Sequence, residues 1–185
     1  MRIHAVALFV LASPLLISQE DDWPLWRVPE TIANCLVAAA PSSKSQLMLD
    51  SSRNPYYLRG DFDGDGKTDL AIALKSKSEP FQVGIGICRG TMAPVLLGSI
   101  ARGKRFTEDA ADMVTSPGWR VITRKELIKI LASTVPQRHR QTGILYKIAD
   151  STGEMIYMPY ETEEGVIYYW HGSFRWYVIN SSDLP

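Results

Sequence analysis

Four aspartates and two glycines crowd a short stretch of the chain between residues 60 and 72. The aspartates are Asp61, Asp63, Asp65 and Asp69, and Gly64 and Gly66 lie between them. Carboxylates this close repel one another unless a cation lies between them, and glycines let the backbone coil tightly around a common centre. Oxygen ligands of this kind suit hard cations, and calcium suits them best. The stretch therefore predicts a calcium site.

The spacing of these residues indicates which atoms would bind the ion. Counted from Asp61 as the first position, the third, fifth and ninth positions are also Asp, and Lys67 at the seventh offers its backbone carbonyl. An EF-hand has a bidentate Glu at its twelfth position and a helix after it, whereas here that position is Ile72 within an expected strand. We therefore expect a calcium loop of another kind, completed by water, with these protein ligands: Asp61, Asp63, Asp65, Lys67 and Asp69.

The stretch resembles the calcium loop of FG-GAP or VCBS repeats, in which the pattern Asp-x-Asp-Gly-Asp-Gly-x-x-Asp leads into an apolar strand. The resemblance covers residues 60–72 and implies a bound calcium ion. In that family the loops recur around β-propellers, but this chain has one copy and too few residues for a propeller, so neither the fold nor the adhesive role follows. The whole chain is more similar to small exported bacterial proteins that have one such loop and a late aromatic hairpin. An Asp/Gly-rich turn without metal is the alternative.

The N-terminus has the pattern of a secretory signal peptide. Arg2 precedes an apolar run, Ile3–Ile17, and polar residues follow from Ser18. The run is short for a membrane span, so we expect residues 1–18 to be cleaved and residues 19–185 to be periplasmic or secreted. An uncleaved anchor is the alternative.

Composition narrows the classes of partner. The chain has 20 basic and 20 acidic residues, and this balance gives no reason to expect nucleic acid or an anionic membrane as a partner. Cys35 and Cys88 are the only cysteines. In an exported protein such a pair suggests a disulfide, although two small buried side chains, one on a helix and one on a strand, would also fit.

The periodicity of apolar residues predicts a single α+β domain with an antiparallel sheet and two or three helices. One helix is expected after Pro29, over residues 30–40, and another over residues 125–133, where Thr123 and Glu126 form a capping box. Strands are expected at residues 70–74, 81–88, 95–97, 144–149 and 155–158, and residues 98–118 are expected to be mostly loop. The clearest hairpin joins residues 166–170 to residues 174–179 through His171 and Gly172.

Aromatic residues gather in that hairpin, on both of its faces. Tyr168 and Trp170 point to one side and Tyr169 to the other. If one face packs against the core, the other needs a covering helix or a ligand. The hairpin is therefore either core on both sides or a face that binds a glycan or a protein.

Other candidate motifs do not support catalysis. Residues 98–105 nearly match a phosphate-binding loop, but Arg105 stands where a hydroxyl is needed. His139 and His171 each lack a second histidine at metal-ligand spacing, and Glu161, Glu163 and Glu164 read as a solvated turn.

Together these features predict an exported, non-catalytic binding domain with one structural calcium ion. We expect its partner to be an envelope or extracellular protein or glycan. The alternative is a hydrolase that acts on cell-wall or glycan polymers through paired carboxylates, which would need a cleft with two carboxyl groups about 5 to 10 Å apart.

Overall fold

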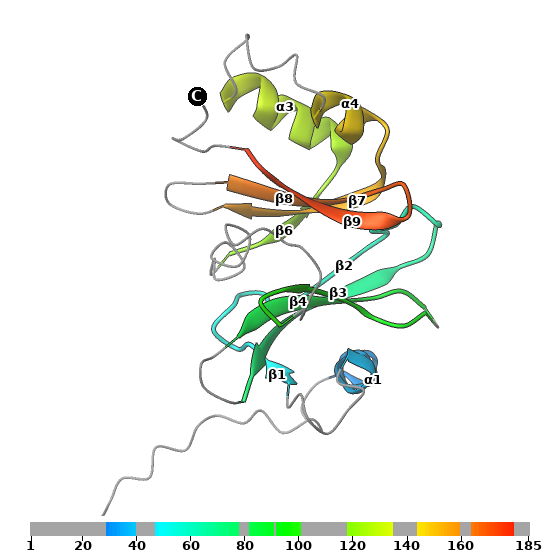
Figure 1. Cartoon of the computed structure of the whole chain (residues 1–185), viewed down its shortest axis with the longest axis vertical. Coiled ribbons are helices and arrows are strands. Elements are labelled where there is room, and N and C mark those ends of the chain that lie inside the picture. The colour runs from blue at the N-terminus through cyan, green and yellow to red at the C-terminus, as the bar shows by residue number, and fades with distance from the viewer. Residues whose placement is uncertain are drawn as a thin grey trace, which may run out of the picture.

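The strands form two antiparallel sheets packed face to face, rather than the one sheet we expected (Figure 1). The computed structural model describes residues 29–39, 47–77, 82–90, 92–100, 118–134, 144–159 and 164–179. Helices cover the outer face of each sheet, so the layers run helix, sheet, sheet, helix (Figure 1). The prediction of an α+β fold with antiparallel strands is confirmed at this level.

The first sheet is organised around β3 (Asp69–Ser76), which follows the aspartate-rich stretch directly. On one side β3 pairs with β4 (Val83–Cys88), which in turn pairs with β5 (Val95–Gly98). On its other side β2 (Tyr57–Gly60) pairs with the first half of β3 and β1 (Leu47–Leu49) with the second half. The strands predicted at residues 70–74 and 95–97 are confirmed, as is the described part of the strand predicted at residues 81–88.

The second sheet has the order β6 (Arg120–Ile122), β7 (Thr152–Pro159), β8 (Glu164–Trp170) and β9 (Ser173–Val178). β8 and β9 are the predicted hairpin, in register from Gly165↔Val178 to Trp170↔Ser173. His171 and Gly172 form its turn with φ of 46° and 80°. Two successive positive φ values are typical of the tight turns that match the twist of a hairpin.

Three helices are described. Helix α1 (Glu30–Ala39) covers the first sheet, and α3 (Arg124–Thr134) and α4 (Ile144–Ala149) cover the second. The capping box at α3 is confirmed, because Glu126 Oε2 accepts hydrogen bonds from the Thr123 amide at 2.7 Å and the Thr123 hydroxyl at 2.8 Å. No helix in the described ranges is both long and apolar enough to cross a membrane.

The strand predicted at residues 144–149 is wrong, because this segment is helix α4. Ile148 is fully buried and the helix contacts α3 and β8, whereas Tyr146 is 70% exposed. A short apolar run fits the period of a helix as well as that of a strand, so its packing partners decide the conformation.

The aromatic hairpin is core on both faces. Tyr169 and Phe174 pack into the cluster between the two sheets, while Tyr168 and Tyr177 pack into the cluster under α3 and α4. Strands that are apolar on both faces must be covered on both faces, which is why the fold has two sheets and outer helices.

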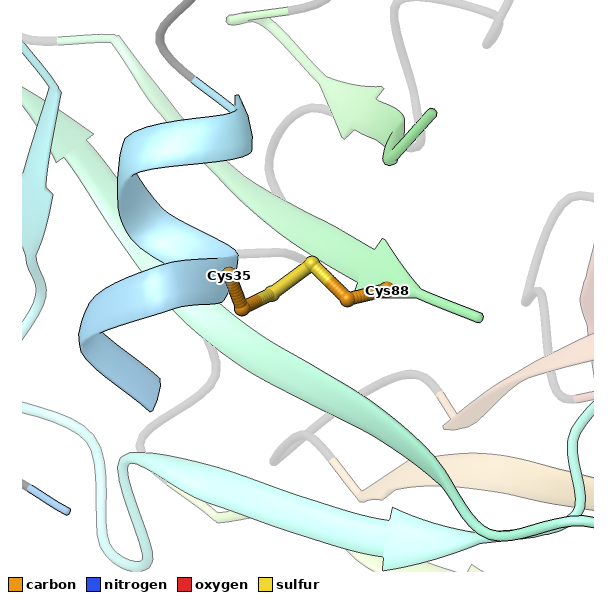
Figure 2. The surroundings of a disulfide bond; sticks show 2 residues. All are labelled: Cys35 and Cys88. Carbon is orange, nitrogen blue, oxygen red and sulfur yellow. A yellow bond between two sulfur atoms is a disulfide. The ribbon is translucent and has the colours of Figure 1, made fainter. Parts of the chain in front are cut away.

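A disulfide joins helix α1 to the first sheet. Cys35 lies in the middle of α1 and Cys88 at the end of β4, and their Cα atoms are 5.8 Å apart (Figure 2). Several sequence predictions lie outside the described residues: the signal peptide at residues 1–18, most of the loop at residues 98–118, and His139, Glu161 and Glu163.

Candidate metal site

The aspartate-rich stretch forms the loop between β2 and β3, and we call residues 61–68 the Asp loop. Its two ends are fixed, because Gly60 pairs with Asp69 as the last step of the β2–β3 ladder. Gly64 and Gly66 have φ of 80° and 82°, a conformation that side chains with a Cβ adopt only at a cost. The glycines therefore serve the coiled backbone that the sequence predicted.

Carboxylates inside the loop hold its backbone. Asp61 accepts hydrogen bonds from the amides of Gly64 at 2.8 Å and Gly66 at 3.0 Å. Asp63 accepts one from the Asp65 amide at 3.1 Å, and Asp65 accepts one from the Lys67 amide at 2.8 Å. Each carboxylate thus turns inward over the loop, so the carboxylates gather at one place.

Three of the predicted ligands come together. Asp61, Asp63 and Asp65 each place one carboxylate oxygen within 4.8 Å of the others. Hydrogen bonds from the Lys67 amide and ammonium group keep the pKa of Asp65 below its ordinary value, so this carboxylate is ionised at neutral pH. Convergent carboxylate oxygens are the ligands that a hard divalent cation prefers.

Asp69 lies behind the loop rather than in this group of three. The residue is 3% exposed, and its Oδ2 accepts a hydrogen bond from the Phe62 amide at 2.9 Å. Burial, with the charges of Asp63 and Asp65 adding to it, raises the pKa of Asp69 to about 6. The negative charges of the loop therefore disfavour the ionised form of Asp69. The predicted role of Asp69 as a metal ligand stays a prediction.

Lys67 contacts the site through its backbone amide and its side-chain ammonium group. Its amide bonds to Asp65, and its ammonium group lies 3.2 Å from the same carboxylate with the side chain 78% exposed. An exposed pair of this kind contributes little to stability. The predicted use of the Lys67 carbonyl as a ligand stays a prediction.

Arg89 connects the Asp loop to the aromatic hairpin, a link that the sequence did not reveal. Its Nη1 lies 3.4 Å from Asp63 Oδ2 and 3.4 Å from the Tyr169 hydroxyl. The guanidinium also lies 5.7 Å from the ring centres of Tyr169 and Phe174, within the range of cation–π attraction. Both Arg89 and Asp63 are mostly buried, at 15% and 7% side-chain exposure, so this pair is far less screened than Lys67 and Asp65.

The loop docks directly on β7 of the second sheet. Asp61 and Glu154 exchange two hydrogen bonds, Glu154 amide to Asp61 carbonyl at 2.6 Å and Asp61 amide to Glu154 carboxylate at 2.9 Å. The Thr152 hydroxyl donates to the Asp63 carbonyl at 2.8 Å. A Cβ on Gly153 would lie 2.5 Å from the Asp61 carbonyl oxygen, so the two backbones touch there. The loop is thereby a bridge between the sheets.

The other described candidate residues, His171 and Glu164, make contacts at the ends of strands in the second sheet. His171 stands in the hairpin turn with its Nε2 3.0 Å from Asp150 Oδ2, and Trp170 donates to the same carboxylate at 3.2 Å. Glu164 begins β8 and its backbone carbonyl accepts a hydrogen bond from the Ile179 amide. These contacts fix the ends of the second sheet, and none of them converges on the Asp loop.

Comparison of the chain with protein-family models, with curated proteins and with solved structures gives no match. The resemblance of residues 60–72 to FG-GAP and VCBS loops therefore stays a prediction.

Proposed function

We propose that this chain is an exported, non-catalytic binding domain whose Asp loop holds one calcium ion. The observation that carries the proposal is the convergence of Asp61, Asp63 and Asp65, whose oxygens lie within 4.8 Å of one another. The three loop carboxylates and the neighbouring carboxyl groups of Asp69 and Glu154 outnumber Lys67 and Arg89, the cations paired with the loop among the described residues. The loop therefore has surplus negative charge that a divalent ion would balance.

Calcium suits this loop better than magnesium does. The carboxylates come from alternate residues of one coiled segment, and a shell built from them would need backbone carbonyls or water to complete it. Calcium accepts six to eight oxygens in flexible geometry, whereas magnesium requires a near-ideal octahedron and keeps its own water.

The ion would have a structural role, because the loop is a bridge between the sheets. Fixing the Asp loop fixes the Asp61–Glu154 and Asp63–Thr152 contacts with β7, and the Asp63–Arg89 contact with the hairpin. Calcium at this place would therefore stabilise the packing of the two sheets rather than the loop alone. The Cys35–Cys88 disulfide supports export, since disulfides persist mainly in oxidising compartments.

The hydrolase alternative receives no support from a pocket that the described residues form beside α1. Asp69 is the one acidic residue that lines it, and a glycan hydrolase needs two carboxyl groups across its cleft. The hairpin offers no exposed aromatic face either, because both of its faces are packed, so a glycan or protein partner would bind elsewhere on the domain. We infer a binding role for the domain.

Thermal unfolding with and without calcium tests the proposal. With a Kd of roughly 10⁻⁴ M, ordinary for extracellular modules, millimolar calcium should add about 1.4 kcal/mol, or a Tm rise of roughly 3 to 6 °C. Asp65→Asn should abolish the rise, and it is a cleaner variant than Asp63→Ala, which would also leave Arg89 without its carboxylate. Glu30→Gln, on α1, removes a carboxylate elsewhere and should keep the rise. An unchanged Tm in chelator-treated wild type after calcium addition would refute the site.

A further inference from the structure

A pocket of about 440 Å³ lies where helix α1 meets the ends of β2, β3 and β4. Three side chains on one face of the first sheet line it, the exposed Arg59 and the half-buried Leu70 and Cys88, since Arg59 pairs with Leu70 and Leu70 pairs with Cys88. Residues directly opposite one another on neighbouring strands point to the same face. This is the face that α1 covers, so the pocket is separate from the Asp loop carboxylates.

One face of α1 forms a wall of this pocket. Thr31, Asn34, Cys35 and Ala38 recur at helical spacing and all line the pocket. The Cys35–Cys88 disulfide ties this wall to the first sheet, so the two cannot separate (Figure 2). A wall that is already fixed lowers the conformational cost of binding a ligand.

The charge of the pocket is set by Arg59. The Arg59 guanidinium takes part in none of the ion pairs found among the described residues. Asp69 also lines the pocket, but successive strand residues face opposite sides, and its carboxylate bonds to the Phe62 amide, which belongs to a residue of the core between the sheets. The side facing α1 therefore presents a cation with neutral polar neighbours.

The chemistry of the other lining residues narrows the ligand. Asn34 and Thr68 offer hydrogen bonds, while Leu70, the disulfide and Met92 offer apolar contact. Met92 is 57% exposed, and a flexible thioether adapts to varied apolar groups. The nearby Asp loop is acidic and repels anions, so a single guanidinium favours a ligand with one negative charge over a phosphate with two. A guanidinium also binds a carboxylate through two parallel hydrogen bonds.

We propose that this pocket binds a small organic monocarboxylate, with Arg59 holding the carboxylate and the disulfide side holding a short apolar group. The volume lies within the usual range for small-molecule sites. Thr68 of the Asp loop and Asp69 also line the pocket, but the proposed contacts come from Arg59 and the disulfide side, so the proposal goes beyond the calcium site and can be tested apart from it.

A titration followed by amide NMR tests the pocket, with N-acetyl-leucine as the probe and its uncharged carboxamide as the matched compound. The acid should shift the amides of Asn34, Arg59 and Leu70, and the carboxamide should bind at least about tenfold more weakly. Arg59→Gln should weaken binding of the acid by a similar factor, while Arg59→Lys should weaken this binding less. Arg175→Gln, an exposed arginine on β9, should leave binding unchanged.

Equal binding of acid and carboxamide, full binding by Arg59→Gln, or no shift at these amides with millimolar probe would each overturn the proposal. Running the titration both in calcium and in chelator separates the two sites. If the probe binds but calcium does not raise the Tm, the calcium site alone is refuted. If calcium raises the Tm but the probe does not bind, the pocket alone is refuted.

Discussion

Asp61 and Glu154 lie 93 residues apart in the chain and exchange two hydrogen bonds, each donating its amide to an oxygen of the other. This reciprocal pair fastens the first turn of the Asp loop to the start of the second sheet. Next to it, Gly153 brings the two backbones into contact. The Asp loop and the junction between the sheets are therefore the same structural feature.

Gly153→Ala should open this junction. Gly153 and Gly172 have similar positive φ values, 75° and 80°, so alanine at either position carries a comparable conformational cost of about 1 to 2 kcal/mol. At Gly153 the new Cβ would also meet the Asp61 carbonyl and the Gly64 amide, whereas at Gly172 it would meet nothing within 4 Å. Urea unfolding should show Gly153→Ala to be less stable than Gly172→Ala by about 1 to 3 kcal/mol. Equal stabilities would contradict the close docking of the loop.

Truncation after Gly165 should prevent folding. It removes β9 and most of β8, including Tyr168 and Phe174, which are buried on opposite faces. Burial of each large apolar side chain contributes about 1.5 to 3 kcal/mol, against a total stability of about 5 to 15 kcal/mol for a domain. We expect residues 19–165 to show no cooperative transition by circular dichroism. A sharp thermal transition in this fragment would mean that the hairpin is not integral to the core.

Reduction of the disulfide should lower the free energy of unfolding. The protein should nevertheless stay folded in the absence of denaturant. Cys35 and Cys88 are separated by 53 residues, and closing a loop of that length stabilises by about 4 kcal/mol in chain-entropy theory. The measurement is urea unfolding of oxidised protein beside the Cys35→Ser/Cys88→Ser double variant. Thiol titration of unfolded, unreduced protein supplies the control, and two reactive thiols there would show that the bridge does not form.

The pH dependence of stability should carry a signature of Asp69. Burial raises the pKa of Asp69 to about 6 from the ordinary 3.8, so between these values the folded protein holds a proton that the unfolded chain has released. The stabilising contribution of this group is therefore fully present below the ordinary pKa and is lost as pH rises through about 6. In chelator, wild type should lose stability relative to Asp69→Asn over this window. Parallel pH profiles for the two proteins would show that the Asp69 carboxyl is not perturbed.

Local features of the sequence predicted much of the structure. The capping box of Thr123 and Glu126 and the coiling of the Asp loop depend on contacts within a few residues, and both follow from residue types and spacing. The hairpin was predictable for the same reason, because His171 and Gly172 form a tight turn between two apolar runs.

Features that depend on distant partners could not be predicted. Residues 144–149 are helical because Ile148 has α3 and β8 to pack against, which a short apolar run does not reveal. The division into two sheets and the docking of Glu154 on Asp61 depend on contacts far apart in sequence. Arg89 gave no signal either, since a single arginine after a strand has many ordinary roles.

Calorimetric titration of chelator-treated protein with calcium tests the central claim most directly. We expect one ion per chain with a Kd of roughly 10⁻⁴ M, little competition from magnesium, and loss of the binding heat in Asp65→Asn but not in Glu30→Gln. Absence of saturable binding in the wild type, or equal binding by Asp65→Asn, would contradict the assignment of the Asp loop as a calcium site.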